Sequence, residues 1–274
     1  MIATGLQWYM VIFFVLFGAW ILRSRRCFSS VGALIRRPCG DSPYAQRLRD
    51  AVDRREALEA LPSEAMATWI GGASLAAALL AALTPIPATL LYAVVCVVLA
   101  GTLAAAYLRL RRAGGRRVAS LRARRPEGAV PAWLSALVAV AAVSRLAYVA
   151  LAPLAAILVT AAGLLIVVLG NRVVHLPALL TGQDPAVEEY VDDRLRAVRS
   201  VNLFATATAP PYVFEAMTFT IAFAQDHDVR HVALHVAAML ASLVALLVSC
   251  AWQFVQMRHA PGASDVERWA RSGV

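Results

Sequence analysis

Seven long apolar stretches divide the chain, and they constrain its fold more than any other feature. A helix that crosses a bilayer needs roughly 20 predominantly apolar residues, and it satisfies its backbone polar groups internally. The sequence therefore predicts an all-α integral membrane protein, a single polytopic domain of residues 1–274 with seven transmembrane helices. The predicted spans are Leu6–Leu22, Met66–Leu83, Ala88–Leu108, Ala132–Ala152, Leu154–Gly170, Val201–Ala224 and Val232–Gln256.

The positions of the arginines support this division and predict an orientation. With seven spans, 24 of the 26 arginines fall in alternate connections and in the segment after the last span, and the chain has no lysine. Basic residues stay on the cytoplasmic side of short loops. The pattern predicts a multi-pass protein of a bacterial-type plasma membrane, with the N-terminus outside and the C-terminus inside. Only Arg145 and Arg230 depart from it.

Composition excludes several classes of protein. Hydrophobic residues make up 60% of the chain and charged residues 16%, which is outside the range of soluble domains. The net charge of +9 follows from the cytoplasmic arginines, which attract anionic lipid headgroups of the bilayer. No nucleic-acid-binding module accompanies this charge, so no nucleic-acid partner is expected. The absence of lysine excludes a retinal Schiff base.

Two cytoplasmic connections have the amphipathic pattern of helices, at about 43–61 and 185–200. In the second, acidic residues come first and arginines last, an order that complements the helix dipole. Its apolar stripe includes Tyr190, Val191 and Leu195, which we predict to face a cytoplasmic or membrane protein partner. The alternative for such a segment is a solvated connector that rests on the inner membrane surface.

The costliest groups for a bilayer lie in the fourth and sixth predicted spans. At 1.5 Å per residue, Arg145 lies about 10 Å and Glu215 about 13 Å below the outer boundary. Opposite charges at matching depth predict a buried ion pair. The alternatives are a lone Glu215 that is protonated or hydrogen-bonded, or binding of a solute by either residue. Pro210 and Pro211 precede Glu215 and predict an interruption of the sixth span.

Three histidines recur at four-residue spacing where the seventh span begins. We refer to His227, His231 and His235 as the histidine cluster. Two histidines at positions i and i+4 of a helix can hold zinc, with a further ligand completing the site. Zinc is thus a candidate cofactor. The alternative is a group of interfacial histidines exposed to solvent or headgroups.

The spacing of His231 and His235 near a seventh span resembles the zinc-binding motif of alkaline ceramidases and adiponectin-receptor-like proteins, which are seven-helix membrane hydrolases. The resemblance covers these two residues and the number of spans. It implies zinc-dependent hydrolysis. Those proteins also use a serine and a histidine in their second span, where this sequence offers Ser74 and no histidine.

No other enzyme motif is present, because the sequence contains no G-x-S-x-G, no P-loop and no dinucleotide-binding glycine fingerprint. The sequence therefore favours a non-enzymatic membrane protein with a polar cluster on its outer side. It would be either permease-like or the membrane subunit of a larger assembly. The alternatives are a metal-dependent intramembrane hydrolase and a membrane-anchored regulatory or sensor protein.

Overall fold

The computed structural model describes residues 2–23, 43–114, 131–176, 185–225 and 229–258, and no strand occurs among them. Within these ranges some side chains lie outside the description, including those of Tyr190, Val191, Leu195, Pro211 and His231. The elements are α1 (Ile2–Arg23), α3 (Pro43–Leu83), α4 (Ala88–Gly114), α5 (Ala132–Ser144), the 3₁₀ helix η2 (Arg145–Tyr148), α6 (Pro153–Val173), α7 (Pro185–Gln225) and α8 (Val229–Arg258).

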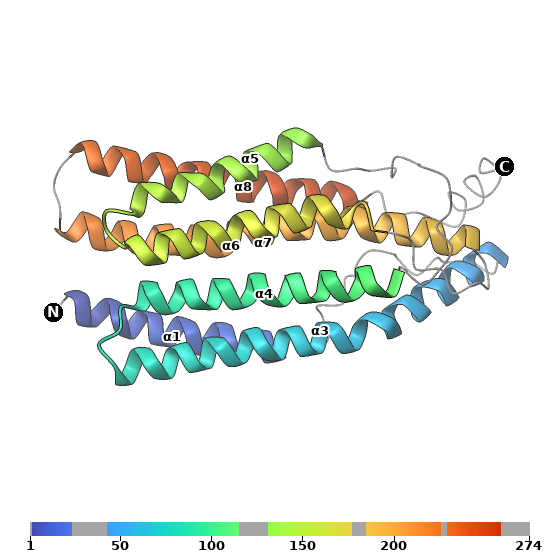
Figure 1. Ribbon diagram of the computed structural model, residues 1–274, viewed down its shortest axis with the longest axis horizontal. Coiled ribbons are helices and arrows are strands. Elements are labelled where there is room, and N and C mark those ends of the chain that lie inside the picture. The colour runs from blue at the N-terminus through green and yellow to red at the C-terminus, as the bar shows by residue number, and fades with distance from the viewer. Residues whose placement is uncertain (1, 24–42, 115–130, 177–184, 226–228, 259–274) are drawn as a thin grey trace.

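The helices lie alongside one another in an elongated bundle (Figure 1). One side of the bundle holds α1, α3 and α4, and the other holds α5, α6, α7 and α8. The start of α1, the turn from α3 to α4 and the turn from α5 to α6 lie at the same end. Consecutive helices therefore run in alternating directions, as in a chain that crosses a layer repeatedly.

Several helices are long and apolar enough to cross a membrane. Four candidate spans lie at Ala65–Leu83, Ala88–Arg112, Pro153–Val173 and Val232–Val255. Two shorter apolar helices lie at Trp8–Arg23 and Ala132–Tyr148. The sixth predicted span is not among these, and in its part of α7 the side chains of Pro211 and of residues 221–225 lie outside the description. The all-helical character and the apolar helices of the prediction are thus confirmed.

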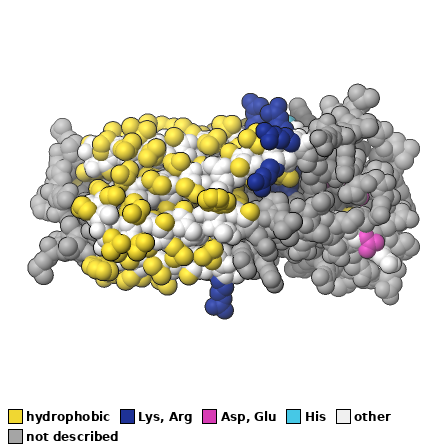
Figure 2. Space-filling model, turned by 60° about the horizontal axis from the view of Figure 1, so that its bottom comes forward, with side chains coloured by type: hydrophobic (Ala, Val, Ile, Leu, Met, Phe, Trp, Pro, Cys, Tyr) yellow, Lys and Arg dark blue, Asp and Glu magenta, His cyan; other side chains and the backbone are white. Residues whose placement is uncertain are grey.

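The surface of the bundle separates by side-chain type. Figure 2 shows hydrophobic side chains over most of the described surface, with Arg side chains at one border of this apolar region. Exposed arginines lie near the ends of α1, α4 and α6. Such a basic border is typical of the level of the lipid headgroups.

Small residues allow the helices to approach closely. A Cβ atom on Gly18 of α1 would lie 3.0 Å from the carbonyl oxygen of Gly71 on α3. A Cβ atom on Gly170 of α6 would lie 2.8 Å from the ring of Phe204 on α7. On the same turn of α7, the Ser200 hydroxyl donates a hydrogen bond of 2.8 Å to the Gly170 carbonyl. These contacts are the small-residue packing expected of helices in lipid.

Two features of α3 and α7 differ from the sequence expectation. The segments 43–61 and 185–200 do not form separate surface helices but continue into the segments that follow, so that α3 and α7 each contain 41 residues. Pro210 and Pro211 do not end α7 either, because the helix continues to Gln225. The continuity past two prolines implies that other groups compensate for their missing amide hydrogens.

Candidate functional site

Arg145 and Glu215 lie together in the interior of the bundle. The Nε atom of Arg145 is 3.4 Å from Oε1 of Glu215, and both side chains are 0% exposed. This distance is that of an ion pair, but the two groups are not aligned for a hydrogen bond. Nε of Arg145 therefore has no hydrogen-bond partner among the described residues. The two charges that the sequence placed at matching depth are thus neighbours in space.

The local structure of the fourth predicted span turns Arg145 inward. The α-helix α5 ends at Ser144, and the chain tightens into η2 from Arg145 to Tyr148. Residues three apart lie on the same side of a 3₁₀ helix, and accordingly Arg145 and Tyr148 are both buried. The sequence predicted a continuous span from Ala132 to Ala152 and gave no sign of this change.

The carboxylate of Glu215 is held from one side. Its Oε1 atom accepts a hydrogen bond of 2.7 Å from the hydroxyl of Ser242 on α8. Its Oε2 atom is buried and has no hydrogen-bond partner among the described residues. Ser242 belongs to the buried face of α8, where small and polar side chains recur every three or four residues.

The guanidinium of Arg145 reaches the backbone of α7. Its Nη2 atom donates a hydrogen bond of 3.1 Å to the carbonyl oxygen of Ala207, while Nη1 has no hydrogen-bond partner in the described part of the chain. Gly163 of α6 provides the space, because a Cβ atom there would lie 2.6 Å from Nη1. We refer to Arg145, Glu215 and Ser242 as the polar centre.

A second contact to α7 comes from α4. The hydroxyl of Tyr92 donates a hydrogen bond of 2.7 Å to the carbonyl oxygen of Pro210, and the side chain of Tyr92 is buried. The double-proline turn of α7 is therefore contacted from two directions, by Arg145 of η2 and by Tyr92 of α4.

His235 packs beside the polar centre. Its ring stacks on the ring of Tyr148, with centroids 4.6 Å apart and planes 15° apart. The Tyr148 hydroxyl donates a hydrogen bond of 2.9 Å to the His235 carbonyl, and Nε2 of His235 lies 3.2 Å from the carbonyl oxygen of Ala147. Only Nδ1 of this buried ring is without a hydrogen-bond partner among the described residues.

The other members of the histidine cluster fall largely outside the description. His227 lies in residues that the structure does not describe, and His231 belongs to α8 without a described side chain. Where side chains are described, no group of three histidine, cysteine, aspartate or glutamate residues could hold a metal ion. The zinc site remains a prediction from spacing.

The predicted partner-facing residues Tyr190, Val191 and Leu195 belong to α7, and their side chains lie outside the description. The described buried polar positions of this segment are Glu188, Asp192, Arg196 and Ser200, which share one face because they are four residues apart, and Ala197 is buried beside them. On that face the Nε atom of Arg196 donates a hydrogen bond of 2.8 Å to Asp192. At 100° per residue, positions 190 and 191 lie more than 100° from the centre of this face, whereas position 195, seven residues after Glu188, lies at its edge.

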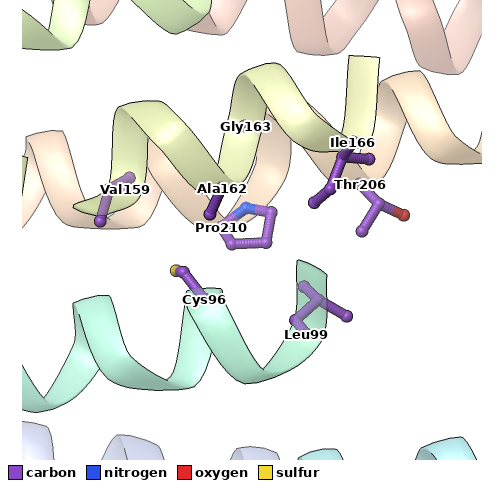
Figure 3. Close-up of a pocket in the computed structure, with 8 residues that line it drawn as sticks. All are labelled: Cys96, Leu99, Val159, Ala162, Gly163, Ile166, Thr206 and Pro210. Carbon is purple, nitrogen blue, oxygen red and sulfur yellow. The ribbon is translucent and has the colours of Figure 1, made fainter. Parts of the chain in front are cut away.

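A small cavity adjoins the double-proline turn. Its volume is about 10 Å³, which is close to the minimum that one water molecule needs. Figure 3 shows it between α4, α6 and α7, with Cys96 and Leu99 on one side and Gly163 and Pro210 among the residues on the other. No larger solute fits this cavity in the conformation described.

Sequence reasoning missed four residues around the polar centre. Ser242, Gly163, Tyr92 and Tyr148 have no distinguishing motif. For Ser242 a signal exists, since it lies seven residues after His235 and therefore on the same helix face. The others depend on contacts between helices, which periodicity within one helix does not specify.

Comparison with protein-family models, with curated proteins and with solved structures finds no match to this chain. The polar centre and the apolar helices are therefore the observations on which a functional proposal depends.

Proposed function

We propose that the chain is a non-enzymatic, permease-like protein of a bacterial-type plasma membrane, in which the polar centre handles protons or a small polar solute. It would cross the membrane seven times, with the N-terminus outside and the C-terminus inside. Support for this topology comes from the arginine distribution and from the alternating directions of the helices.

The observation that carries the proposal is an incompletely satisfied ion pair in the interior. Nε and Nη1 of Arg145 and Oε2 of Glu215 are buried without hydrogen-bond partners in the described structure. Removing two charges from water costs several kcal/mol per ion, and apolar residues of similar volume are often as stable or more stable. An ionisable pair kept at this depth therefore supports a functional role.

The size of the cavity decides which solute to test first. The cavity is lined by Gly163, which adjoins Arg145, and not by the polar centre itself, and its volume of about 10 Å³ accommodates at most one water-sized species. Protons can pass between carboxylates and water without a wider path, so a proton is the smallest probe of the site. A larger solute would require the helices to separate.

A flux assay tests the proposal directly. Purified protein is reconstituted in vesicles that contain a pH-sensitive dye, and a potassium diffusion potential drives protons inward. We expect the intact protein to conduct protons above the rate of empty vesicles, and Glu215→Gln to abolish this at equal protein content. Ser249→Ala is the matched control, because Ser249 is a buried residue of α8 whose hydroxyl has no hydrogen-bond partner in the described structure. Flux equal to that of empty vesicles would refute a proton pathway.

Reporter fusions test the topology separately. A fluorescent protein at the C-terminus should fluoresce, as it does in the cytoplasm, and alkaline phosphatase inserted between Thr84 and Pro87 should be active outside. Inactive phosphatase at this turn, or a dark C-terminal reporter, would contradict the proposed orientation.

The second candidate function is a membrane subunit of a larger assembly. It is supported by the 185–200 segment, where the charged side chains of Glu188, Asp192 and Arg196 are buried and where Tyr190 and Val191 of the predicted stripe lie on another face of the helix. This function predicts that a partner co-purifies in mild detergent and is lost when the stripe is made polar. Exchange of the exposed Gln46 and Asp50 of α3 for other polar residues provides the control.

A further inference from the structure

The backbone of α7 has two carbonyl groups that its own helix cannot satisfy. In an α-helix the N–H of each residue donates to the carbonyl four residues earlier. Proline has no N–H, so Pro210 and Pro211 leave the carbonyl oxygens of Thr206 and Ala207 without their helical donors. In hydrocarbon such a group is costly unless neighbouring protein supplies a donor.

For one of these carbonyls the structure contains a replacement donor. Nη2 of Arg145 lies 3.1 Å from the Ala207 oxygen, the acceptor that an amide at position 211 would have served. The contact is fully buried, and it joins positions 62 residues apart in the chain. No side-chain donor to the Thr206 oxygen occurs among the described hydrogen bonds, so the two carbonyls differ.

We propose that Arg145 supplies the hydrogen-bond donor that α7 lacks at Pro211 and thereby holds the two halves of α7 in one continuous helix. The same guanidinium contacts Glu215, one turn beyond the prolines on α7. Arg145 is a positioning residue in this role. Loss of its contact leaves the Ala207 carbonyl unsatisfied, and α7 bends at the double-proline turn.

The surroundings of this turn allow such a bend. The cavity of about 10 Å³ lies against Pro210 and Thr206 (Figure 3), so the turn is less tightly packed there. Tyr92 holds the Pro210 carbonyl from α4 and limits the movement on that side. The half of α7 after the prolines carries Glu215, so a bend moves the carboxylate relative to α8.

The groups around Glu215 determine how the hydrogen bond responds to its charge. Arg145 of η2 and Ser242 of α8 contact the carboxylate, whereas the hydroxyl of Tyr148 donates to the His235 carbonyl. An ionised Glu215 attracts the guanidinium and keeps it near α7. A neutral Glu215 removes this attraction and leaves the Ala207 carbonyl as the acceptor that holds Arg145 in place.

The two prolines provide a matched test. Arg145→Met removes the donor, and Pro211→Ala in that background restores an amide opposite the Ala207 carbonyl. Pro210→Ala restores one opposite the Thr206 carbonyl instead, which Arg145 does not contact. The measurement is hydrogen exchange of the backbone amides of residues 212–216, which are common to all variants, in purified detergent-solubilised protein.

We expect Arg145→Met to accelerate exchange in this segment by about tenfold or more, because a buried hydrogen bond to a charged donor is lost. Adding Pro211→Ala should return the rate to within about threefold of the original, whereas adding Pro210→Ala should not. Equal rescue by both prolines, or rescue by neither, would overturn the proposal.

A second set of variants covers the case in which Arg145→Met prevents folding. If Arg145→Met does not accumulate, the same comparison is made in Arg145→Met with Glu215→Gln, where no charge is left unpaired. The hydrogen-exchange measurement reports on the α7 backbone and not on flux. A failed proton assay would therefore leave this inference standing, and a failed exchange experiment would leave the proposed function standing.

Discussion

Replacing Gly163 by alanine tests the geometry of the polar centre with a single methyl group. The new Cβ atom would lie 2.6 Å from Nη1 of Arg145. To restore an ordinary contact of 3.4 Å, the guanidinium must move by about 0.8 Å. Because Nη1 and Nη2 belong to one planar guanidinium, a shift of this size displaces Nη2 as well, and a displacement along the bond would lengthen the 3.1 Å hydrogen bond to the Ala207 carbonyl to about 3.9 Å, beyond hydrogen-bonding range.

The size of the effect follows from two opposing contributions. A lost buried hydrogen bond of this kind destabilises by about 1–3 kcal/mol, and alanine gains about 1 kcal/mol over glycine as a helix former. We expect Gly163→Ala to lower the free energy of unfolding by about 1 kcal/mol. Gly101→Ala is the control, because nothing lies within 4 Å of its Cβ position, and it should be neutral or stabilising by up to about 1 kcal/mol.

The assay is reversible unfolding in mixed detergent micelles, followed by circular dichroism, with thermal stability as a second measurement. The informative quantity is the difference between the two alanine variants, in which the helix propensities cancel and the loss of the hydrogen bond, about 1–3 kcal/mol, remains. If Gly163→Ala is as stable as Gly101→Ala, the guanidinium is not confined as described, and the reasoning about the polar centre is wrong.

Three further predictions concern single contacts. Ser242→Ala should destabilise by about 1.5–3 kcal/mol because Glu215 loses its hydrogen-bond donor, whereas Ser249→Ala should change the free energy of unfolding little; equal effects would contradict a specific contact. Tyr92→Phe should destabilise by about 1 kcal/mol by removing the donor to the Pro210 carbonyl, and unchanged thermal unfolding would argue against this bond. The proposed non-enzymatic function predicts that titration of purified protein with zinc near neutral pH gives no stoichiometric binding, and one zinc per chain would instead favour the hydrolase alternative.

Much of the architecture could be predicted from the sequence, because hydrocarbon imposes strong constraints. Apolar runs indicated the helices, and the depths of Arg145 and Glu215 placed the two charges near one another. Both inferences need only the rise per residue and the cost of burying charge.

The remaining features depend on contacts between helices that one-dimensional patterns do not specify. Pro210 and Pro211 predicted an interruption, yet α7 continues, since Arg145 donates to the Ala207 carbonyl that lacks its helical donor, and Tyr92 holds the neighbouring Pro210 carbonyl. The change from α5 to η2 has no proline or glycine to mark it. The space beside Gly163 is meaningful only once Arg145 is known to occupy it.

The division of the bundle has a consequence for how the protein can be produced. The polar centre and its glycine contact come entirely from η2, α6, α7 and α8, and α4 adds the hydroxyl of Tyr92. The helices α1 and α3 pack on one another through Gly18 and Gly71. A gene cut between α4 and α5 would therefore yield two polypeptides, each with its own internal contacts, that should reassociate when they are synthesised in the same cell.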